Sequence, residues 1–381
     1  MVGAGVFGAW TAWNFLCRGK RVLLLDAAGP AHPRASSGGE SRLTRTAYGA
    51  DEVYTRMAWE SLPEWKWLSE TADLPVFHSL GALFFFAGME PYAADTLEVH
   101  RKLSLPIETL DHSELARRFP QFCWDGIEFG LWEPDFGALM ARRSVQALVA
   151  RFVAAGGEYR LAQVAPPRSV LPQSDALDAL VVSGGERLRA SDYVFACGPW
   201  LPKLFPDLLG SRMFVTRQEV FFFAVPPGDA RFEPAAMPGW VDFNFGDMFY
   251  GFPNLEARGV KVGRDEHGPP MDPDIGDRLP SMETLAAVRA YMARRFPALA
   301  DSPLNELRIC QYENTSGGDF LIDRHSRWQN AWLVGGGSGH GFKHGPAVGR
   351  YAAQLVSGEP LTLEPRFSLA TKGEKQQRAV H

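Results

Sequence analysis

The spacing of apolar residues along the 381-residue chain predicts a mixture of helices and strands. Apolar positions recur at helical intervals in four stretches, which predict helices over 54–72, 139–157, 282–296 and 346–358. Short apolar runs with polar or glycine boundaries predict strands over 81–88, 192–198, 215–225 and 331–337. Between 215 and 275 the strands alternate with turns such as "VPPGD" and "HGPPMDPD", which is typical of an antiparallel sheet.

The beginning of the chain has the order of a dinucleotide-binding βαβ unit. Gly3, Gly5 and Gly8 form a GxGxxG turn, which is followed by a helical stretch and by an apolar strand that ends at Asp26. In such a unit the glycines allow a tight turn, the close approach of a pyrophosphate and the packing of helix on strand. The helix N-terminus presents N–H groups to the phosphates, and an acid about 20 residues later accepts hydrogen bonds from ribose hydroxyls. Gly3, Gly5, Gly8 and Asp26 are therefore candidate cofactor-binding residues.

The strand that should lead into Gly3 is too short. Met1 and Val2 precede that glycine, whereas a strand usually has about five residues. Either the recorded start lies downstream of the true one, or the central strand is a stub. A stub removes ladder hydrogen bonds and apolar burial, so we expect lower stability and weaker retention of the cofactor.

A second glycine cluster, "VGGGSGHGFKHGPAVG", occupies residues 334–349. It follows a predicted strand and opens a predicted helix, as a turn that faces a phosphate or a ring would do. Two such turns at opposite ends of the chain indicate a cofactor longer than one mononucleotide. FAD meets that demand better than NAD.

Composition narrows the set of partners. The formal net charge is -5, and the scattered Lys and Arg form no basic stripe, so we expect neither nucleic acid nor a membrane as a partner. No run of 18 apolar residues and no signal-peptide pattern occurs, and we therefore expect a cytoplasmic protein. The cysteines lack the CxxC spacing of a zinc site and are too few for a disulfide scaffold, so no metal is predicted; they are Cys17, Cys123, Cys197 and Cys310.

Several motifs together resemble the family of monomeric sarcosine oxidase, N-methyltryptophan oxidase and pipecolate oxidase. They are the opening GxGxxG, "GESRLTRTAYG" (39–49), "FYGFP" (249–253), "GVKVG" (259–263), "RICQY" (308–312) with "DFLIDRH" (319–325), and "GSGHGFK" (337–343). The resemblance spans nearly the whole chain. It implies an α/β fold in which an antiparallel-sheet substrate domain of α+β type is inserted into a Rossmann-type FAD-binding domain. We predict that 1–80, 135–212 and 305–381 form the FAD domain, and that 81–134 and 213–304 form the substrate domain.

The resemblance also implies how the cofactor is held. In the family a cysteine forms a thioether with the flavin 8α carbon, and Cys310 stands at that position. A cysteine without such a context is more often a small buried hydrophobe, which is how we interpret Cys17. Arg42 matches the arginine that lies against the flavin ring. The remaining cofactor positions are Val164, Gly339, Gly341 and Lys343.

Substrate positions follow from the same resemblance. Arg45 and Lys343 match the pair that binds the substrate carboxylate, which would orient the adjacent C–H bond toward flavin N5. Lys261 matches the lysine beside the flavin, where a positive charge would stabilise superoxide as it forms. Tyr250 and Tyr312 match aromatic residues of the substrate cavity, although core packing is an alternative for each.

Two positions depart from the family. Asp265 stands where relatives carry a histidine, and it either pairs with the substrate ammonium or faces solvent in a polar loop. Gly38 replaces a second histidine, and this loss of bulk changes the expected shape of the cavity. Both departures make sarcosine itself a doubtful substrate.

The leading hypothesis is FAD-dependent oxidation of a secondary or cyclic α-amino acid. Hydride passes to flavin N5, an imine leaves, and oxygen reoxidises the flavin to give hydrogen peroxide. The alternatives are a flavin dehydrogenase with another electron acceptor and a flavin-binding protein without turnover, whereas simple NAD binding explains neither Cys310 nor the second glycine turn. The expected partners are a small amino acid with a carboxylate and oxygen, and the protein is expected to be a monomer or a small homo-oligomer.

Overall fold

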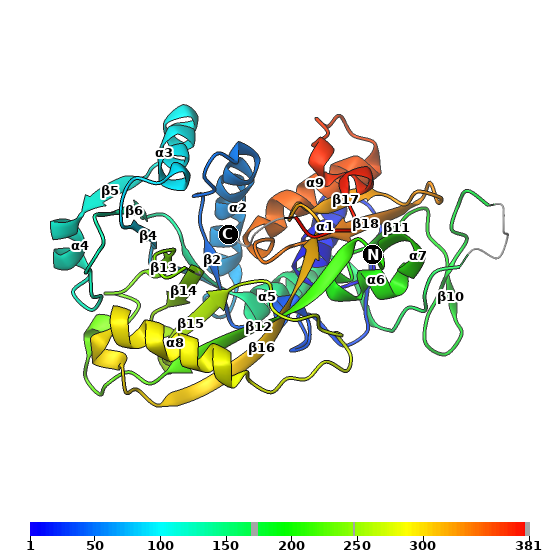
Figure 1. The fold of residues 1–381 in the computed structure, drawn as a ribbon. Coiled ribbons are helices and arrows are strands. Elements are labelled where there is room, and N and C mark those ends of the chain that lie inside the picture. Colours follow the sequence, from blue (N-terminus) through cyan, green and yellow to red (C-terminus); the bar gives the residue numbers. More distant parts are fainter. Residues whose placement is uncertain (169–173, 247, 378–381) are drawn as a thin grey trace.

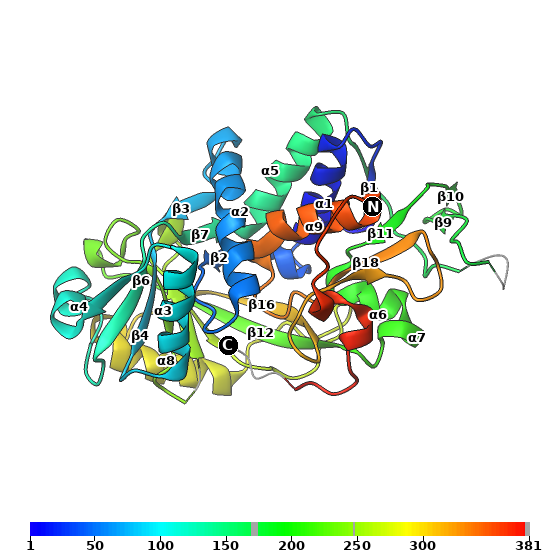
Figure 2. The ribbon, with the colours of Figure 1, turned by 90° about the horizontal axis from the view of Figure 1, so that it is seen from above.

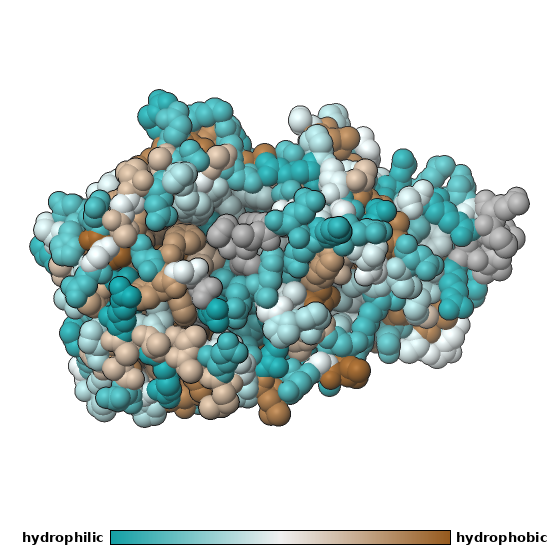
Figure 3. Space-filling view, in the orientation of Figure 1, coloured by the Kyte–Doolittle hydropathy of each residue, from teal (hydrophilic) through white to brown (hydrophobic). Residues whose placement is uncertain are grey.

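The computed structural model describes residues 1–168, 174–246 and 248–377. One side of the molecule holds strands that pair largely in parallel, with helices packed over them. The other side holds a large, mainly antiparallel sheet (Figure 1). Figure 3 shows apolar residues scattered among hydrophilic ones on the face seen in Figure 1. Among the described residues, no helix is long and apolar enough to cross a membrane.

The dinucleotide-type part begins with α1 (Val6–Cys17) and β1 (Leu23–Asp26). β1 pairs in parallel with β8 (Glu158–Leu161), and β11 (Tyr193–Phe195) pairs in parallel with β18 (Ala331–Gly335). β17 (Leu321–Arg324) adds an antiparallel edge to β18. This part of the chain therefore has the predicted βαβ beginning.

A single residue joins these two groups of strands. Val2 forms parallel bridges to Leu25 on one side and to Phe195 on the other. Its amide donates to Val194 O at 2.8 Å, and its carbonyl accepts from Ala196 N at 2.8 Å. Val2 therefore takes the place of a central strand between β1 and β11.

Helices cover the parallel strands. α1 packs against α5 (Ala141–Ala154) and α9 (Gly345–Ser357), and α2 (Glu52–Thr71) packs against α9 (Figure 2). The Asp51 carboxylate caps α2 by accepting from Tyr54 N at 3.3 Å. α1 is apolar along nearly its whole length, and its Trp10 ring lies 5.2 Å from the ring of Trp65 in α2. A helix of that kind is stable where neighbours cover it on several sides.

The large sheet has the strand order β16-β12-β15-β14-β13-β4-β6-β5. Its neighbouring strands are antiparallel except for β13 and β4, which are parallel. In that order the bounds are Leu304–Thr315, Met213–Phe223, Val260–Asp265, Met248–Phe252, Gly239–Asp242, Ala82–Phe86, Phe129–Glu133 and Glu108–Asp111. The antiparallel pairing predicted for 215–275 is confirmed, while the division into two domains stays a prediction.

A three-stranded sheet connects the two parts. It contains β2 (Ser41–Thr44), β7 (Gly137–Met140) and β3 (Phe77–Ser79), in the order β2-β7-β3. The other described α-helices and strands are α3 (Pro91–Leu103), α4 (His112–Arg118), α6 (Leu201–Leu204), α7 (Pro206–Leu209), α8 (Met282–Arg295), β9 (Leu180–Val181) and β10 (Arg187–Leu188). The predicted helices over 54–72, 139–157, 282–296 and 346–358 are confirmed, with ends shifted by a few residues.

Candidate active site

Two adjoining cavities lie where the parallel strands meet the large sheet. The larger cavity has a volume of about 300 Å³, and the smaller one of about 140 Å³. Arg42, Cys310 and Tyr312 line both, so the two form one elongated site. Predicted cofactor residues from both ends of the chain line the smaller cavity, namely Gly3, Gly5, Asp26, Gly339 and Gly341. The site therefore has the extended form that a dinucleotide needs.

Both glycine turns are built for close approach of a ligand. Gly3 has φ +98° and Gly339 has φ +80°, values that side-chain-bearing residues rarely adopt. A Cβ at Gly339 would press on the Tyr312 ring, and one at Gly8 would overlap the carbonyl oxygen of Gly3. The first turn of α1 opens onto the smaller cavity, where its N–H groups favour an anion such as a phosphate. These turns fit a dinucleotide cofactor.

Asp26 is fixed at the end of β1, on the wall of the smaller cavity. Its Oδ2 accepts from Ala4 N at 2.7 Å, and its Oδ1 accepts from Ala28 N at 2.9 Å and from Gly29 N at 2.8 Å. A carboxylate offers about four acceptor positions, so it can also accept from ribose hydroxyls. Its position agrees with the predicted role.

Cys310 lies on β16 at the junction of the two cavities, beside Arg42 of β2. Arg42 Nη2 is 3.6 Å from the Cys310 sulfur and donates to Ser36 O at 2.8 Å. The guanidinium also lies 6.0 Å from the Phe342 ring centroid. A flavin that extends from the glycine turns into the larger cavity would pass this thiol.

Two predicted cofactor residues lie behind the walls of the site. Gly8 packs on the Gly3 turn. Val164 lies in the apolar core with Leu25 and Phe195, and neither it nor Gly8 belongs to the described residues that line the two cavities. Direct contact between Val164 and the cofactor stays a prediction.

Arg45 and Lys343 meet in the larger cavity, although they lie at opposite ends of the chain. Their exposed fractions are 7% and 6%. Lys343 Nζ donates to the Tyr48 hydroxyl at 2.8 Å and to His340 O at 3.0 Å. Arg45 lies 4.1 Å from the Tyr48 ring centroid. Two buried cations in one cavity favour an anionic ligand, and a carboxylate suits the forked guanidinium.

Tyr48, His340 and His344 support these cations, and the sequence analysis did not assign them. The Tyr48 hydroxyl is 2.7 Å from His344 Nε2 and 3.2 Å from His340 Nδ1. Burial and then the charges of Lys343 and Arg45 hold the pKa of His344 well below its usual value, so this histidine is neutral. Tyr48 and His340 lie within the motifs "GESRLTRTAYG" and "GSGHGFK", and His344 directly follows the second motif. Their nearness to these motifs is the feature of the sequence that could have identified them.

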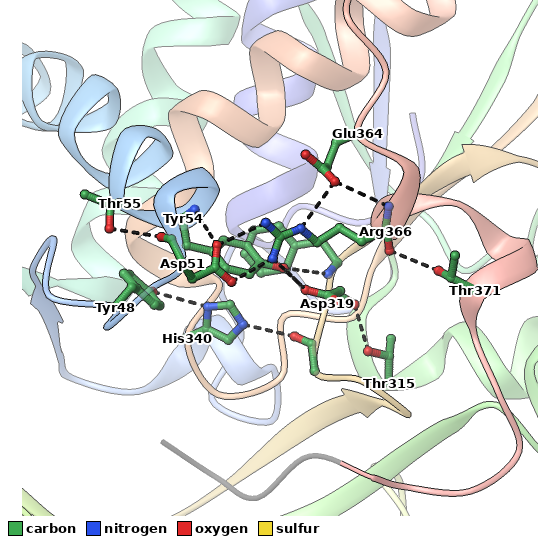
Figure 4. A network of polar contacts seen from close by, with 12 residues as sticks. Tyr48, Asp51, Tyr54, Thr55, Thr315, Asp319, His340, Glu364, Arg366 and Thr371 are labelled. Carbon is green, nitrogen blue, oxygen red and sulfur yellow. Dashed lines mark hydrogen bonds and ion pairs between the residues drawn. The ribbon is translucent and has the colours of Figure 1, made fainter. Parts of the chain in front are cut away.

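Figure 4 shows His340 between Tyr48 and a second polar network. Its Nε2 is 3.0 Å from Gly318 O. In that network Arg366 pairs with Asp51 at 2.6 Å and with Asp319 at 3.6 Å. The network ties the C-terminal segment to the start of α2 and to the turn after β16. It therefore stabilises the turn whose Gly318 carbonyl contacts His340.

Asp265 lines the larger cavity together with Tyr250 and Tyr312. Its Oδ1 accepts from the Tyr312 hydroxyl at 2.8 Å. Burial, and then the charge of Asp265, raises the pKa of both tyrosines, so both phenols keep their protons at neutral pH. Asp265 thus lies on the cavity wall at the end of β15, and its pairing with a substrate ammonium stays a prediction.

Lys261 lies behind the wall of the larger cavity. Its Nζ donates to Ser41 O at 2.9 Å and to Ser41 Oγ at 3.1 Å, and its exposed fraction is 2%. Ser41 lines the larger cavity, whereas Lys261 lines a hollow of about 10 Å³ behind it. Burial and then the charge of Arg42 hold the pKa of Lys261 well below its usual value. Ser41 therefore stands between Lys261 Nζ and the larger cavity, and a role of the lysine toward oxygen stays a prediction.

Gly38 lines the larger cavity with its backbone, and a side chain here would point toward residues 32–33. A Cβ at this position would overlap the carbonyl oxygen of His32. The Gly38 carbonyl accepts from Arg142 Nη2 at 2.8 Å. The local backbone thus requires glycine, and the direction of the absent side chain is toward the backbone of residues 32–33.

Comparisons with known proteins agree with this geometry. A family model described as "FAD dependent oxidoreductase" matches residues 1–355. Monomeric sarcosine oxidase of Streptomyces avermitilis is 30% identical over 361 residues, which are 93% of this chain and 92% of the relative. N-methyl-L-tryptophan oxidase of Citrobacter koseri is 28% identical over 377 residues, which are 97% and 96% of the two chains.

The fold is shared more widely. The crystal structure of L-proline dehydrogenase from P. horikoshii superposes with a TM-score of 0.83 at 19% identity, over 97% of this chain and 95% of that one. The predicted fold class, the resemblance to sarcosine and N-methyltryptophan oxidases and the FAD cofactor are thereby confirmed. The chain is a flavin oxidoreductase and belongs to the FAD dependent oxidoreductase family.

Proposed function

We propose that this protein oxidises a secondary or cyclic α-amino acid at the carbon next to nitrogen. The observation that carries the proposal is the larger cavity, which has Arg45 and Lys343 for a carboxylate and Asp265 for an amine. The relatives named sarcosine oxidase and N-methyl-L-tryptophan oxidase support an N-substituted amino acid as the substrate class. FAD, when bound, accepts a hydride at flavin N5 and passes the electrons on to oxygen, which gives hydrogen peroxide.

The residues of the cavity bind and orient the substrate. Arg45 and Lys343 hold the carboxylate, which restricts rotation of the α-carbon and lowers the entropic part of the barrier. Asp265 attracts the ammonium, and Tyr312 fixes the carboxylate of Asp265 through its 2.8 Å hydrogen bond. The amine must lose its extra proton before hydride leaves the adjacent carbon, and we assign that proton to the Asp265 carboxylate. The resulting imine leaves and is hydrolysed in water.

We also propose that Cys310 attaches the flavin covalently. Its thiol lies at the junction of the two cavities, beside Arg42. Cys197 is the other cysteine that lines the smaller cavity, and burial raises its pKa, so it stays a protonated and unreactive thiol. After acid precipitation the yellow colour is expected in the pellet of the native protein and in the supernatant of Cys310→Ser. Colour in the native supernatant would remove the covalent link.

Oxygen as the electron acceptor is a separate part of the proposal. Lys261 reaches the cavity wall through Ser41, and the relatives named oxidases favour oxygen, whereas a dehydrogenase shares the fold. Comparison of peroxide yield with dye reduction decides between the two acceptors. Peroxide below one equivalent per substrate, together with fast dye reduction, would favour the dehydrogenase.

The substrate assignment is tested by anaerobic reduction of the bound flavin. Bleaching of the yellow colour is expected with one or more members of a panel of N-methyl, cyclic and primary α-amino acids. A panel that leaves the colour unchanged would favour the flavin-binding protein without turnover. A cytoplasmic location and a monomer or small homo-oligomer stay predictions.

A further inference from the structure

Glu313 is a buried acid on the wall of the smaller cavity that the mechanism above does not use. It lies on β16, and its exposed fraction is 6%. Oε1 accepts from Gly337 N at 3.3 Å, whereas Oε2 has no hydrogen-bond partner among the described residues. In the part of the chain that the structure describes, no cation acts on the acid.

The surroundings of Glu313 belong to the cofactor site. A Cβ at Gly198 would lie 3.0 Å from Oε2, and a Cβ at Gly335 would lie 3.1 Å from Oε1. Gly3 and Gly337, one from each glycine turn, line the same cavity. Glu313 lines this cavity with them, so a dinucleotide that fills the cavity would lie against the side chain of Glu313.

An ionised carboxylate is poorly suited to this place. It has no cation to offset its burial, and the phosphates that both turns favour would repel it. Burial raises the pKa of Glu313 to about 7. The neutral acid instead offers an O–H donor on the side that lacks a partner.

We propose that Glu313 binds FAD as a neutral carboxylic acid, which donates its proton to an acceptor oxygen of the ribityl–diphosphate chain. The inference rests on the FAD cofactor and is independent of the amino-acid substrate. It predicts that FAD affinity decreases as the pH rises. If the protonated form alone binds, the dissociation constant between pH 6.5 and 8.5 rises on the order of 20-fold.

Other titratable groups face the same region. Cys197 follows β11, Asp26 ends β1, and the α-amino group of Met1 donates to Leu23 O at 2.9 Å. Burial lowers the pKa of that amino group to about 6 and raises the pKa of Cys197. All three groups are retained in Glu313→Gln, so a pH dependence that they cause would survive this substitution.

The test measures equilibrium binding of FAD by the apoprotein of Cys310→Ser, in which no thioether at position 310 can form. Quenching of FAD fluorescence is titrated at pH 6.5 and 8.5 in this parent and in Cys310→Ser/Glu313→Gln. Glutamine keeps the shape and an N–H donor but does not titrate. We expect the roughly 20-fold loss in the parent, and we expect a change below threefold in the glutamine variant.

Riboflavin, which has no phosphate, serves as the second ligand. A pH dependence that persists with riboflavin assigns the acceptor to the ribityl hydroxyls, and one that appears with FAD alone assigns it to the diphosphate. A flat affinity in the parent overturns the proposal, and that result does not require the glutamine variant to fold. Equal pH slopes in parent and variant overturn it as well. Neither outcome bears on the amino-acid substrate, because no turnover is measured.

Discussion

Replacement of Lys343 by methionine tests the carboxylate site most sharply. The ammonium is buried in the larger cavity and donates to Tyr48 and to His340 O. Methionine preserves most of the volume and removes the charge. The hydrogen bond between the Tyr48 hydroxyl and His344 Nε2, which measures 2.7 Å, does not involve Lys343. We therefore expect it to remain in the variant.

The magnitude follows from one charged hydrogen bond. Such a bond contributes about 1.5–3 kcal/mol. The dissociation constant of an amino-acid substrate should therefore rise about 10- to 150-fold, since each 1.4 kcal/mol corresponds to a factor of ten. A decarboxylated amine of the same skeleton has no group for Lys343, so its dissociation constant should change little.

The assay is the anaerobic rate of flavin bleaching as a function of substrate concentration, and the concentration that gives half of the limiting rate is the dissociation constant. Binding of the amine, which is expected to bleach the flavin little, is titrated through the change in the flavin absorbance spectrum. Lys372→Met is the matched control, because Lys372 is also buried but donates to Arg366 O and Thr371 Oγ1, away from both cavities. A rise of the dissociation constant below threefold in Lys343→Met, or an equal rise in Lys372→Met, would refute the assignment of Lys343 to the substrate carboxylate.

Three further outcomes are expected. Asp265→Asn should raise the dissociation constant of the amino acid at least tenfold, because the ammonium loses its ionic partner, whereas an unchanged constant would leave the acid without a substrate role. Gly8→Ala should lower the free energy of unfolding by about 1–3 kcal/mol in a urea titration, because the new methyl group overlaps Gly3 O, and an unaltered midpoint would contradict this overlap. The apoprotein should lose up to about 3 kcal/mol of stability as the pH rises from 4.5 through 7, because folded Glu313 binds its proton more tightly than the unfolded chain does. That loss should be absent in Glu313→Gln, and urea titrations at pH 5 and 8 measure it.

Local patterns predicted the parts of the fold whose contacts are near in sequence. The turn at Gly3 and Gly5, α1 and the acid at Asp26 lie within one short unit, so their order in the chain determines their arrangement. The long helices α2 and α5 were likewise predictable from apolar periodicity, because each buries one continuous face.

Contacts between distant segments could not be predicted in the same way. The Tyr48 hydroxyl reaches His344 across 296 positions of the chain. Glu313 of β16 likewise lies between Gly198, which follows β11, and Gly335 of β18. Lys261 illustrates the same limit, because Ser41 of β2 separates it from the cavity and no motif contains both residues. A resemblance to a family indicates which residues belong to the site. Whether a residue lines the cavity or lies behind its wall depends on how the sheets pack.

Binding of an α-amino acid in the larger cavity through its carboxylate is tested most directly by anaerobic reduction of the native enzyme. A cyclic or N-methyl amino acid and the decarboxylated amine are compared at the same concentration. We expect rapid bleaching of the flavin by the amino acid and little or none by the amine. Equal bleaching by both compounds would contradict binding through the carboxylate.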